Sequence, residues 1–501
     1  MFRTSLRVAV AASVALSAVA FAVPGRDADP LHQAFVGFTD DVTEADLGLL
    51  TSLGATDLLP IESVDTVAVT APVSVLRELE QRDDVRGVRS ERRIELNLFE
   101  SVNYIGAGDV DQPAVYDDEG VQRLRPGVDG SGVTVAVVDS GLWEVHPDFG
   151  DRVLGHYGFE FSGFVNGASD TDEDNLLTEE QRDAFSEAQG AYDLADEVGH
   201  GTHVAGTIGG NGAMWTASEA YPENVGVAPG VNLVGLKMAA VFSGVVADAG
   251  FERNATAAFD WLLRNHDDPK FGPNGIQVAN NSWGLYPDDV LFGTPAYDPL
   301  QELAQALEDE GVILVFAGGN SGGDDQNHTI DESPTGTDAV ITVAAACKPE
   351  SSSASSDCGN PIQPEGITSF SSRGVAQDHP DADRYTIDVA APGHEIIAAA
   401  SHMSVLYPLG QLGGVYGESD ADEAANRMWY TSMSGTSMAA PHVAGVVALM
   451  VQVDPTLTTE EVRSILTETA RPLAGFSFQA QGHGLVDVEA ALIETHRRAV
   501  A

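Results

Sequence analysis

Three short motifs contain residue types that together could carry out nucleophilic catalysis. Asp139 ends an apolar run, His200 lies between two glycines, and Ser437 precedes a stretch of small residues typical of a helix. A serine hydroxyl becomes a nucleophile when a histidine takes its proton and an aspartate stabilises the charged histidine. The N-terminal end of a helix also favours the negative charge that such an attack creates.

Each motif has an ordinary structural alternative when it is taken alone. Aspartates often end strands as turn formers, and a serine at a helix start is commonly an N-cap. His200 and His203 are three residues apart and could bind a metal ion, but no HExxH pattern or third ligand accompanies them. The three motifs together, in this order, favour nucleophilic catalysis.

The elements that must position these residues are predicted to be the strands and helices of an α/β fold. Near-continuous apolar runs suit strands that are buried on both faces. They occur at 133–138, 231–236, 276–279, 312–317 and 339–345, and helical patterns lie at 255–264, 299–308 and 460–469. This alternation predicts a parallel sheet with helices on both faces and functional residues at the carboxyl ends of its strands.

The chain before this sheet is predicted to contain an export signal and a small separate α+β unit. Residues 1–22 have two arginines, an apolar run and the exit sequence Ala20-Phe21-Ala22, which is the layout of a cleaved signal peptide. Residues 31–98 combine strand patterns with a helical pattern at 73–82. We expect a secreted, extracellular protein with no membrane span in its mature form. An uncleaved membrane anchor is the alternative.

The charge balance excludes some classes of partner. The 501 residues include 76 acidic and 25 basic side chains, which gives a formal net charge of −51. Bulk electrostatics therefore argue against binding to nucleic acid or to an anionic membrane. The excess of carboxylates fits either adaptation to a salty medium or simple solubility. Two polar, acidic segments, 169–197 and 418–426, are predicted to be surface insertions.

Cys347 and Cys358 are the only cysteines, and they flank a serine-rich loop. In an exported protein we expect them to form a disulfide. Two free thiols are the alternative.

The three motifs resemble those of the subtilisin-like serine proteases, the subtilases, in sequence and in chain order. Residues 31–98 are similar to the inhibitory propeptide of that family, and residues 101–493 are similar to its catalytic domain. The resemblance implies that Ser437 is the nucleophile, that His200 is the general base and that Asp139 holds the histidine. It implies no cofactor for the chemistry.

The resemblance also assigns oxyanion-binding and substrate-binding roles. Asn320 matches the asparagine that helps to form the oxyanion hole. A strand with an exposed edge would pair with an extended peptide, and a pocket beside it would take the side chain before the scissile bond. The matching residues are Ser282, Trp283 and Gly284 for the strand and Ala317, Gly318, Gly319 and Glu332 for the pocket. Glu332 would favour Lys or Arg in the substrate, and a solvated loop acid is the alternative.

The sequence departs from the family pattern where calcium would bind. Asp148 follows Asp139 at the spacing of a calcium ligand in many subtilases, so the resemblance implies a structural calcium there. The loop 211–224, which would supply further ligands, is not recognisably similar. Asp170, Asp172 and Asp174 alternate like a calcium loop, but no Gly or Glu completes an EF-hand.

Together these features predict a secreted serine endopeptidase of broad specificity that is made as a self-processed zymogen. Its partners would be protein or peptide substrates and its own propeptide, cleaved near residues 96–101, and we expect a monomer. One alternative is a non-catalytic peptide-binding protein on the same scaffold. The other is a processing protease of narrow specificity.

Overall fold

The computed structural model describes residues 29–91, 93–96, 128–159, 196–215, 225–239, 241–242, 245–246, 251–286, 298–323, 329–330, 334–335, 337–347, 358, 366–375, 386–402, 404 and 429–500. The predicted signal peptide at 1–22, Glu332, the alternating aspartates Asp170, Asp172 and Asp174 and the acidic segment 418–426 lie outside the described residues.

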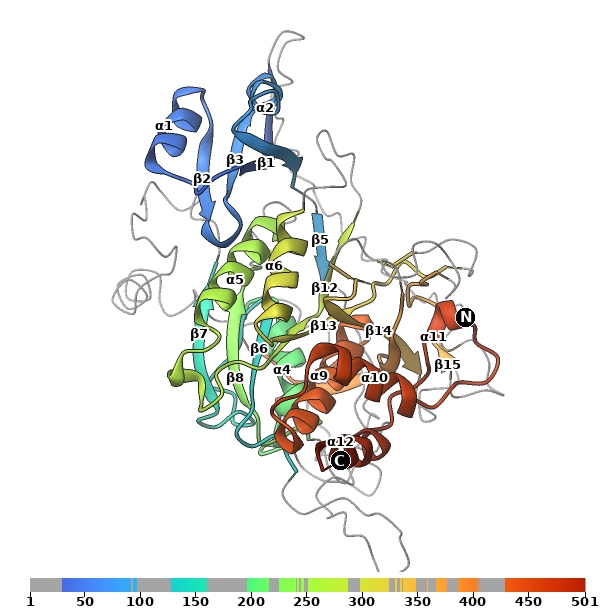
Figure 1. The fold of residues 1–501 in the computed structure, drawn as a ribbon. Coiled ribbons are helices and arrows are strands. Elements are labelled where there is room, and N and C mark those ends of the chain that lie inside the picture. Colours follow the sequence, from blue (N-terminus) through green and yellow to red (C-terminus); the bar gives the residue numbers. More distant parts are fainter. Residues whose placement is uncertain are drawn as a thin grey trace, which may run out of the picture.

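A mostly parallel sheet forms the centre of the main unit (Figure 1). Its strands lie in the order β15-β14-β13-β11-β6-β8-β7, and β16 also pairs with β14. These strands are β6 (Thr134–Asp139), β7 (Val153–Gly158), β8 (Asn232–Lys237), β11 (Val278–Asn281), β13 (Ile313–Ala317), β14 (Val340–Cys347), β15 (Gly366–Ile367) and β16 (Val389–Pro392). All the pairings are parallel except that of β14 with β15, which confirms the predicted α/β class.

Alternate residues of the central strands β6, β11 and β13 face two different apolar cores. In β6, Val135 and Val137 belong to one core, whereas Ala136 and Val138 belong to the other. This two-residue period follows from strand geometry and explains why both faces of the strand are apolar. Helices α4 (His200–Gly209), α9 (Thr436–Val453), α10 (Thr459–Thr469) and α12 (Val488–Ala499) complete the first core, and α5 (Phe251–Asn265) and α6 (Pro299–Asp309) complete the second.

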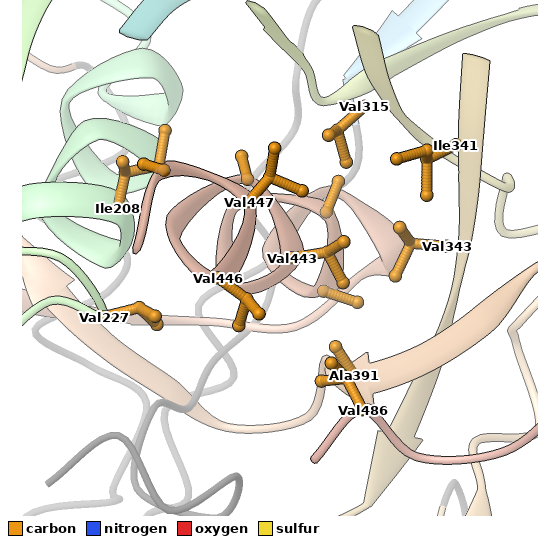
Figure 2. Packing of buried hydrophobic residues seen from close by; sticks show 14 of the residues in the cluster. Ile208, Val227, Val315, Ile341, Val343, Ala391, Val443, Val446, Val447 and Val486 are labelled. Carbon is orange, nitrogen blue, oxygen red and sulfur yellow. The ribbon is translucent and has the colours of Figure 1, made fainter. Parts of the chain in front are cut away.

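Helix α9 runs through the middle of the first core (Figure 2). Its residues Val443, Val446 and Val447 lie among Ile208 of α4 and branched side chains of the sheet, such as Val315. Within the described part of the chain, α9 is the helix long and apolar enough to cross a membrane, but 89% of its most apolar window is buried inside the fold. It is therefore the core helix of a globular domain.

The N-terminal unit is a four-stranded antiparallel sheet with two helices and a core of its own. Its strands have the order β2-β3-β1-β4. Its elements are β1 (Leu31–Phe38), α1 (Glu44–Ser52), β2 (Thr56–Ile61), η1 (Glu62–Val64), β3 (Thr66–Pro72), α2 (Val73–Leu79) and β4 (Val85–Ser90), so the helix predicted at 73–82 ends three residues earlier. The other face of this sheet adds Phe35, Leu59 and Ile61 to the core under α5 and α6, on which the unit rests (Figure 1).

The remaining helices and strands of the described residues are short. The two-stranded pairs are β5 (Arg93–Leu96) with β12 (Trp283–Tyr286), β9 (Val241–Phe242) with β10 (Val245–Val246), and β17 (Ile396–Ala399) with β18 (Tyr430–Met433). A 3-10 turn, η4 (Pro269–Phe271), follows α5, and the short helix α11 (Phe478–Gln481) precedes α12.

Candidate active site

The residues singled out in the sequence lie at strand ends and helix starts on one edge of the sheet. Asp139 is the last residue of β6, and Ser282 follows β11 directly. His200 is the first residue of α4, and Ser437 is the second residue of α9. Helices α4 and α9 pack against each other in the same core, so the three motifs converge although they are far apart in the sequence.

Asp139 and His200 form a buried hydrogen-bonded pair. Nδ1 of His200 lies 2.7 Å from Oδ1 of Asp139, and neither side chain is exposed. The backbone N–H of Ser140 donates to the same carboxylate oxygen, at 2.7 Å. Gly201 lies so close to the carbonyl oxygen of Gly141 that a side chain at this position would collide with the backbone. The small residue after His200 therefore allows α4 to approach the end of β6.

Ser437 lies in the first turn of α9, where the positive end of the helix dipole favours an anion. Its hydroxyl donates to the carbonyl oxygen of Ser282, at 2.7 Å, and the Ser282 hydroxyl donates back to the carbonyl oxygen of Ser437, at 2.6 Å. This reciprocal pair joins the start of α9 to the end of β11. Gly435 precedes the helix and donates its N–H to the carbonyl of Gly393, at 2.8 Å.

Asn320 is oriented by α9 itself. Its Oδ1 accepts from the backbone N–H and from the hydroxyl of Thr436, both at 2.9 Å. With the oxygen held in this way, the side-chain NH₂ remains as the donor. The preceding Gly319 has a φ of +100°, a conformation that favours glycine, and its carbonyl accepts from the N–H of Ser372, at 2.9 Å. The structure thus brings Asn320 next to the residue that precedes Ser437.

The predicted substrate-binding strand is β12 with the residue before it. The Trp283 indole is fully buried and donates to the carbonyl of Val138, at 3.0 Å, so its side chain belongs to the core and only its backbone can serve as an edge. That backbone pairs antiparallel with β5, with Gly284 opposite Glu95 and Trp283 opposite Leu96. Ala317 and Gly318 are buried at the end of β13. The pocket residue Glu332 lies outside the described residues.

A second buried carboxylate beside the Asp139–His200 pair was missed by the sequence analysis. Asp196 falls in the acidic segment 169–197, which is predicted to be a surface insertion. For Asp196 this prediction is wrong, because its side chain is fully buried and accepts hydrogen bonds from Gly199, Thr202 and Ser140. The only local signal is its position four residues before His200.

His203 has a structural role in this arrangement. Its Nε2 lies 2.9 Å from the carbonyl oxygen of Ile396 in β17, and burial lowers its pKa to about 3. The ring is therefore neutral and ties α4 to β17.

Asp148 is a buried carboxylate that accepts hydrogen bonds from other parts of the fold. Its Oδ1 accepts from the hydroxyl of Tyr430, at 2.7 Å, and lies 3.4 Å from the N–H of Met214. A calcium ion would need several further oxygen ligands around this carboxylate, and residues 216–224 of the loop 211–224 that would supply them lie outside the described residues. Among the described residues, no three His, Cys, Asp or Glu side chains converge as a metal site. The calcium ligand that the resemblance implies at Asp148 therefore stays a prediction.

Cys347 and Cys358 form the disulfide expected from the sequence. Cys347 is the last residue of β14, so the bridge ties Cys358 to the end of this strand.

The fold and the site define a class of protein. It is an α/β protein in which an Asp–His pair, a helix-borne serine and an asparagine donor meet at the carboxyl ends of a parallel sheet. The model of the subtilase family matches residues 130–484, which is more than half of the chain. The chain therefore belongs to the subtilase family, whose characterised members are serine proteases, and the resemblance is confirmed.

Individual relatives agree with this assignment. Serine protease AprX of Bacillus subtilis (strain 168) is 32% identical over 341 residues, which cover 67% of this chain and 61% of the relative. Subtilisin DY of Bacillus licheniformis is 28% identical over 365 residues, which cover 73% of this chain and 92% of the relative.

A solved structure shows the same fold. The crystal structure of fervidolysin from Fervidobacterium pennivorans, described as a keratinolytic enzyme related to subtilisin, superposes with a TM-score of 0.59 at 22% identity. The match covers 93% of this chain and 62% of fervidolysin. This chain therefore spans about three fifths of the length of AprX and of fervidolysin.

Proposed function

We propose that this chain is a secreted serine endopeptidase that hydrolyses protein substrates through an acyl-enzyme intermediate. The observation that carries the proposal is one arrangement: the buried Asp139–His200 pair lies at the start of α4, which packs against α9, and Ser437 is in the first turn of α9 with Asn320 anchored to Thr436 before it. A non-catalytic peptide-binding protein on the same scaffold would not need these four side chains together. The signal-like sequence at 1–22 is the support for export.

In the proposed mechanism, the Ser437 proton, which the Ser282 carbonyl accepts in the resting structure, passes to Nε2 of His200. Oγ then attacks the scissile carbonyl carbon. The oxyanion accepts from the Ser437 backbone N–H and the Asn320 NH₂, and Asp139 stabilises the imidazolium. His200 returns the proton to the leaving amine, and a water molecule repeats the sequence to release the acyl group. No cofactor takes part.

We also propose that residues 31–98 act as an inhibitory propeptide. Strand β5 pairs with β12, the edge on which an extended substrate would lie, so the chain itself occupies part of the cleft. The N-terminal unit is further held on α5 by a buried ion pair of Arg89 with Glu252, at 2.8 Å. Cleavage then falls soon after β5, between residues 96 and 101. The substrate range is broad unless Glu332 selects basic residues.

Intact mass and activity of wild type beside Ser437→Ala, in high salt, test the proposal. Wild type should lose about 100 residues, cleave casein and react with a serine-directed covalent inhibitor, with loss of activity. The variant should stay full length and inactive, because it lacks the nucleophile. N-terminal sequencing then gives the cleavage site.

Each of the other outcomes would support a different function or mode of activation. If wild type binds extended peptides but never cleaves them, the non-catalytic scaffold replaces the proposal. If it becomes active only after addition of another protease, self-processing fails while the protease assignment stands. Cleavage restricted to a few sites, lost in Glu332→Gly, would identify a narrow processing protease.

A further inference from the structure

Asp196 is a fully buried carboxylate that the proposed mechanism does not use. Its two oxygens accept from the N–H of Gly199, at 2.7 Å, from the N–H of Thr202, at 2.8 Å, and from the hydroxyl of Ser140, at 2.8 Å. A buried carboxylate without such donors would be costly. The donors come from two different segments, one on each side of the Asp139–His200 hydrogen bond.

On the histidine side, Asp196 supplies the cap that α4 lacks. The N-cap residue is Gly199, with a φ of +90° and no side chain. The carboxylate of Asp196 instead binds the free N–H groups at the start of the helix, which also favours its negative charge. His200 is the first residue of that helix, so Asp196 fixes the backbone from which the imidazole projects.

On the aspartate side, Ser140 carries the link onward. Its hydroxyl donates to Asp196 and accepts from the N–H of Gly201, at 2.9 Å, while its own N–H donates to Oδ1 of Asp139. The end of β6 and the start of α4 are therefore joined twice. One link is the side-chain pair Asp139–His200, and the other runs through Ser140 and Asp196.

From this double connection we propose that Asp196 is a positioning residue for the catalytic pair: through Ser140 and the first turn of α4, it sets the separation and alignment of Asp139 and His200. The inference rests on the proposed protease function. Burial raises the pKa of Asp196, and its hydrogen bonds with Thr202, Gly199 and Ser140 oppose that rise. An asparagine in its place has one acceptor oxygen, so it cannot accept from Ser140, Gly199 and Thr202 together, and its NH₂ group would face at least one backbone N–H donor.

A merely structural cap would affect folding, whereas a positioning residue also affects turnover. The variants to compare are Asp196→Asn, Ser140→Ala and the control Asp487→Asn. Asp487 also caps a helix, by accepting from the N–H of Ala490 at 2.9 Å, but it caps α12 and is not among the partners of the site residues. Activity on a short chromogenic peptide is normalised to active sites titrated with a covalent serine inhibitor.

We expect kcat of Asp196→Asn to fall by about 10- to 100-fold with KM within about twofold, because a small misplacement of a catalytic group is costly. Ser140→Ala should show a smaller loss of the same kind, and Asp487→Asn none. In the Ser437→Ala background, the downfield proton resonance of the His200 Nδ1–H should shift in Asp196→Asn and stay in place in Asp487→Asn.

Unchanged kcat and an unchanged His200 resonance in both site variants would overturn the proposal. If Asp196→Asn does not fold, Ser140→Ala decides alone, since it removes the bridge and keeps the cap. An inactive wild type would instead refute the proposed protease function, and the proton resonance would still report on the Asp139–His200 geometry.

Discussion

The α9 side and the α5/α6 side of the central sheet are closed by different kinds of contact. On the α9 side, the core consists of apolar side chains of the main unit itself, such as Val443 and Val447 (Figure 2). On the α5/α6 side, the N-terminal unit completes the core, and charged groups are buried between the two units. Arg89 pairs with Glu252, and Glu91 accepts from the backbone N–H of Arg253, at 3.2 Å.

This difference matches what each side has to do. Apolar burial stabilises the fold both before and after the propeptide leaves. The α9 side, whose helices carry His200 and Ser437, therefore stays packed. Buried ion pairs lose hydration and add little net stability, although they require a matching partner. An interface that contains buried ion pairs is therefore specific for its partner, and the two units can still separate. The proposed propeptide occupies the separable side and pairs with the substrate edge β12, while the helices that carry His200 and Ser437 lie on the permanent side.

Replacement of Asn320 tests the site at the permanent side and should have the largest effect. Asn320→Ala removes the side-chain donor and leaves the Thr436 N–H without its acceptor. We expect kcat to fall by about 100- to 1,000-fold with little change in KM, a range measured for the corresponding loss in subtilisin itself. The measurement is steady-state hydrolysis of a peptide substrate.

An increase in KM with unchanged kcat would show that Asn320 contributes only to substrate binding. Asn265→Ala is a suitable control, because the Asn265 side chain also hydrogen-bonds to the backbone, its NH₂ donating to the carbonyl of Trp261, but it lies at the end of α5. It should leave kcat unchanged.

The pH dependence of propeptide release tests the separable side. Burial raises the pKa of Glu91 to about 7, from an ordinary 4.5. The bound state therefore holds a proton that the released propeptide gives up, so this group's contribution to binding is complete below pH 4.5 and is lost as the pH rises through 7. If Glu91 alone titrates, binding should be about 70-fold weaker at pH 8 than at pH 5.

The fraction of self-cleaved propeptide that remains bound can be measured by size exclusion and mass spectrometry across this range. Glu91→Gln should make retention nearly independent of pH, because glutamine has no proton to lose. A pH dependence that persists unchanged in Glu91→Gln would assign the titration to another group. Tighter binding at high pH would contradict the sign of the prediction.

The sequence predicts those parts of the site that lie in short motifs of neighbouring residues. Asp139, His200 and Ser437 lie in motifs that also contain glycines and small residues, which the close packing of the helices against the strand ends requires. The strands are recognisable as continuous apolar runs because both of their faces are buried. Asp196 could not be predicted from composition, because it lies in an acidic stretch and its burial depends on α4 folding over it. Asp148 likewise finds its partner in Tyr430, far along the chain.

The same Val→Ala substitution, made once on the α9 side and once on the α5/α6 side, tests whether only the α9 side stabilises the mature enzyme. Val447 is fully buried in α9, and Val64 of the N-terminal unit is 8% exposed in the core under α5 and α6. Val447→Ala should destabilise the mature enzyme by about 2 kcal/mol, the order expected for two lost methyl groups. Val64→Ala should leave the mature enzyme unchanged and weaken propeptide retention by about 10- to 30-fold.

Thermal inactivation of the mature enzymes and propeptide retention at one pH are the two measurements. Equal loss of mature stability in both variants would mean that the N-terminal unit is a permanent part of the fold. The contrast between the two sides would then fail.

The smallest expected effect distinguishes exposed from buried charges within the same interface. Arg86 and Glu302 join the two units at 2.9 Å, but their side chains are 38% and 34% exposed. Water and salt screen such a pair, so it should contribute less than about 1 kcal/mol, or under about fivefold in retention. A double-mutant cycle with Arg86→Ala and Glu302→Gln isolates the pair energy, since Arg86 also donates to the carbonyl of Val64. A coupling of several kcal/mol would mean that this pair, and not the buried charges around Glu91, holds the propeptide, and it would place the specificity of the interface at its rim.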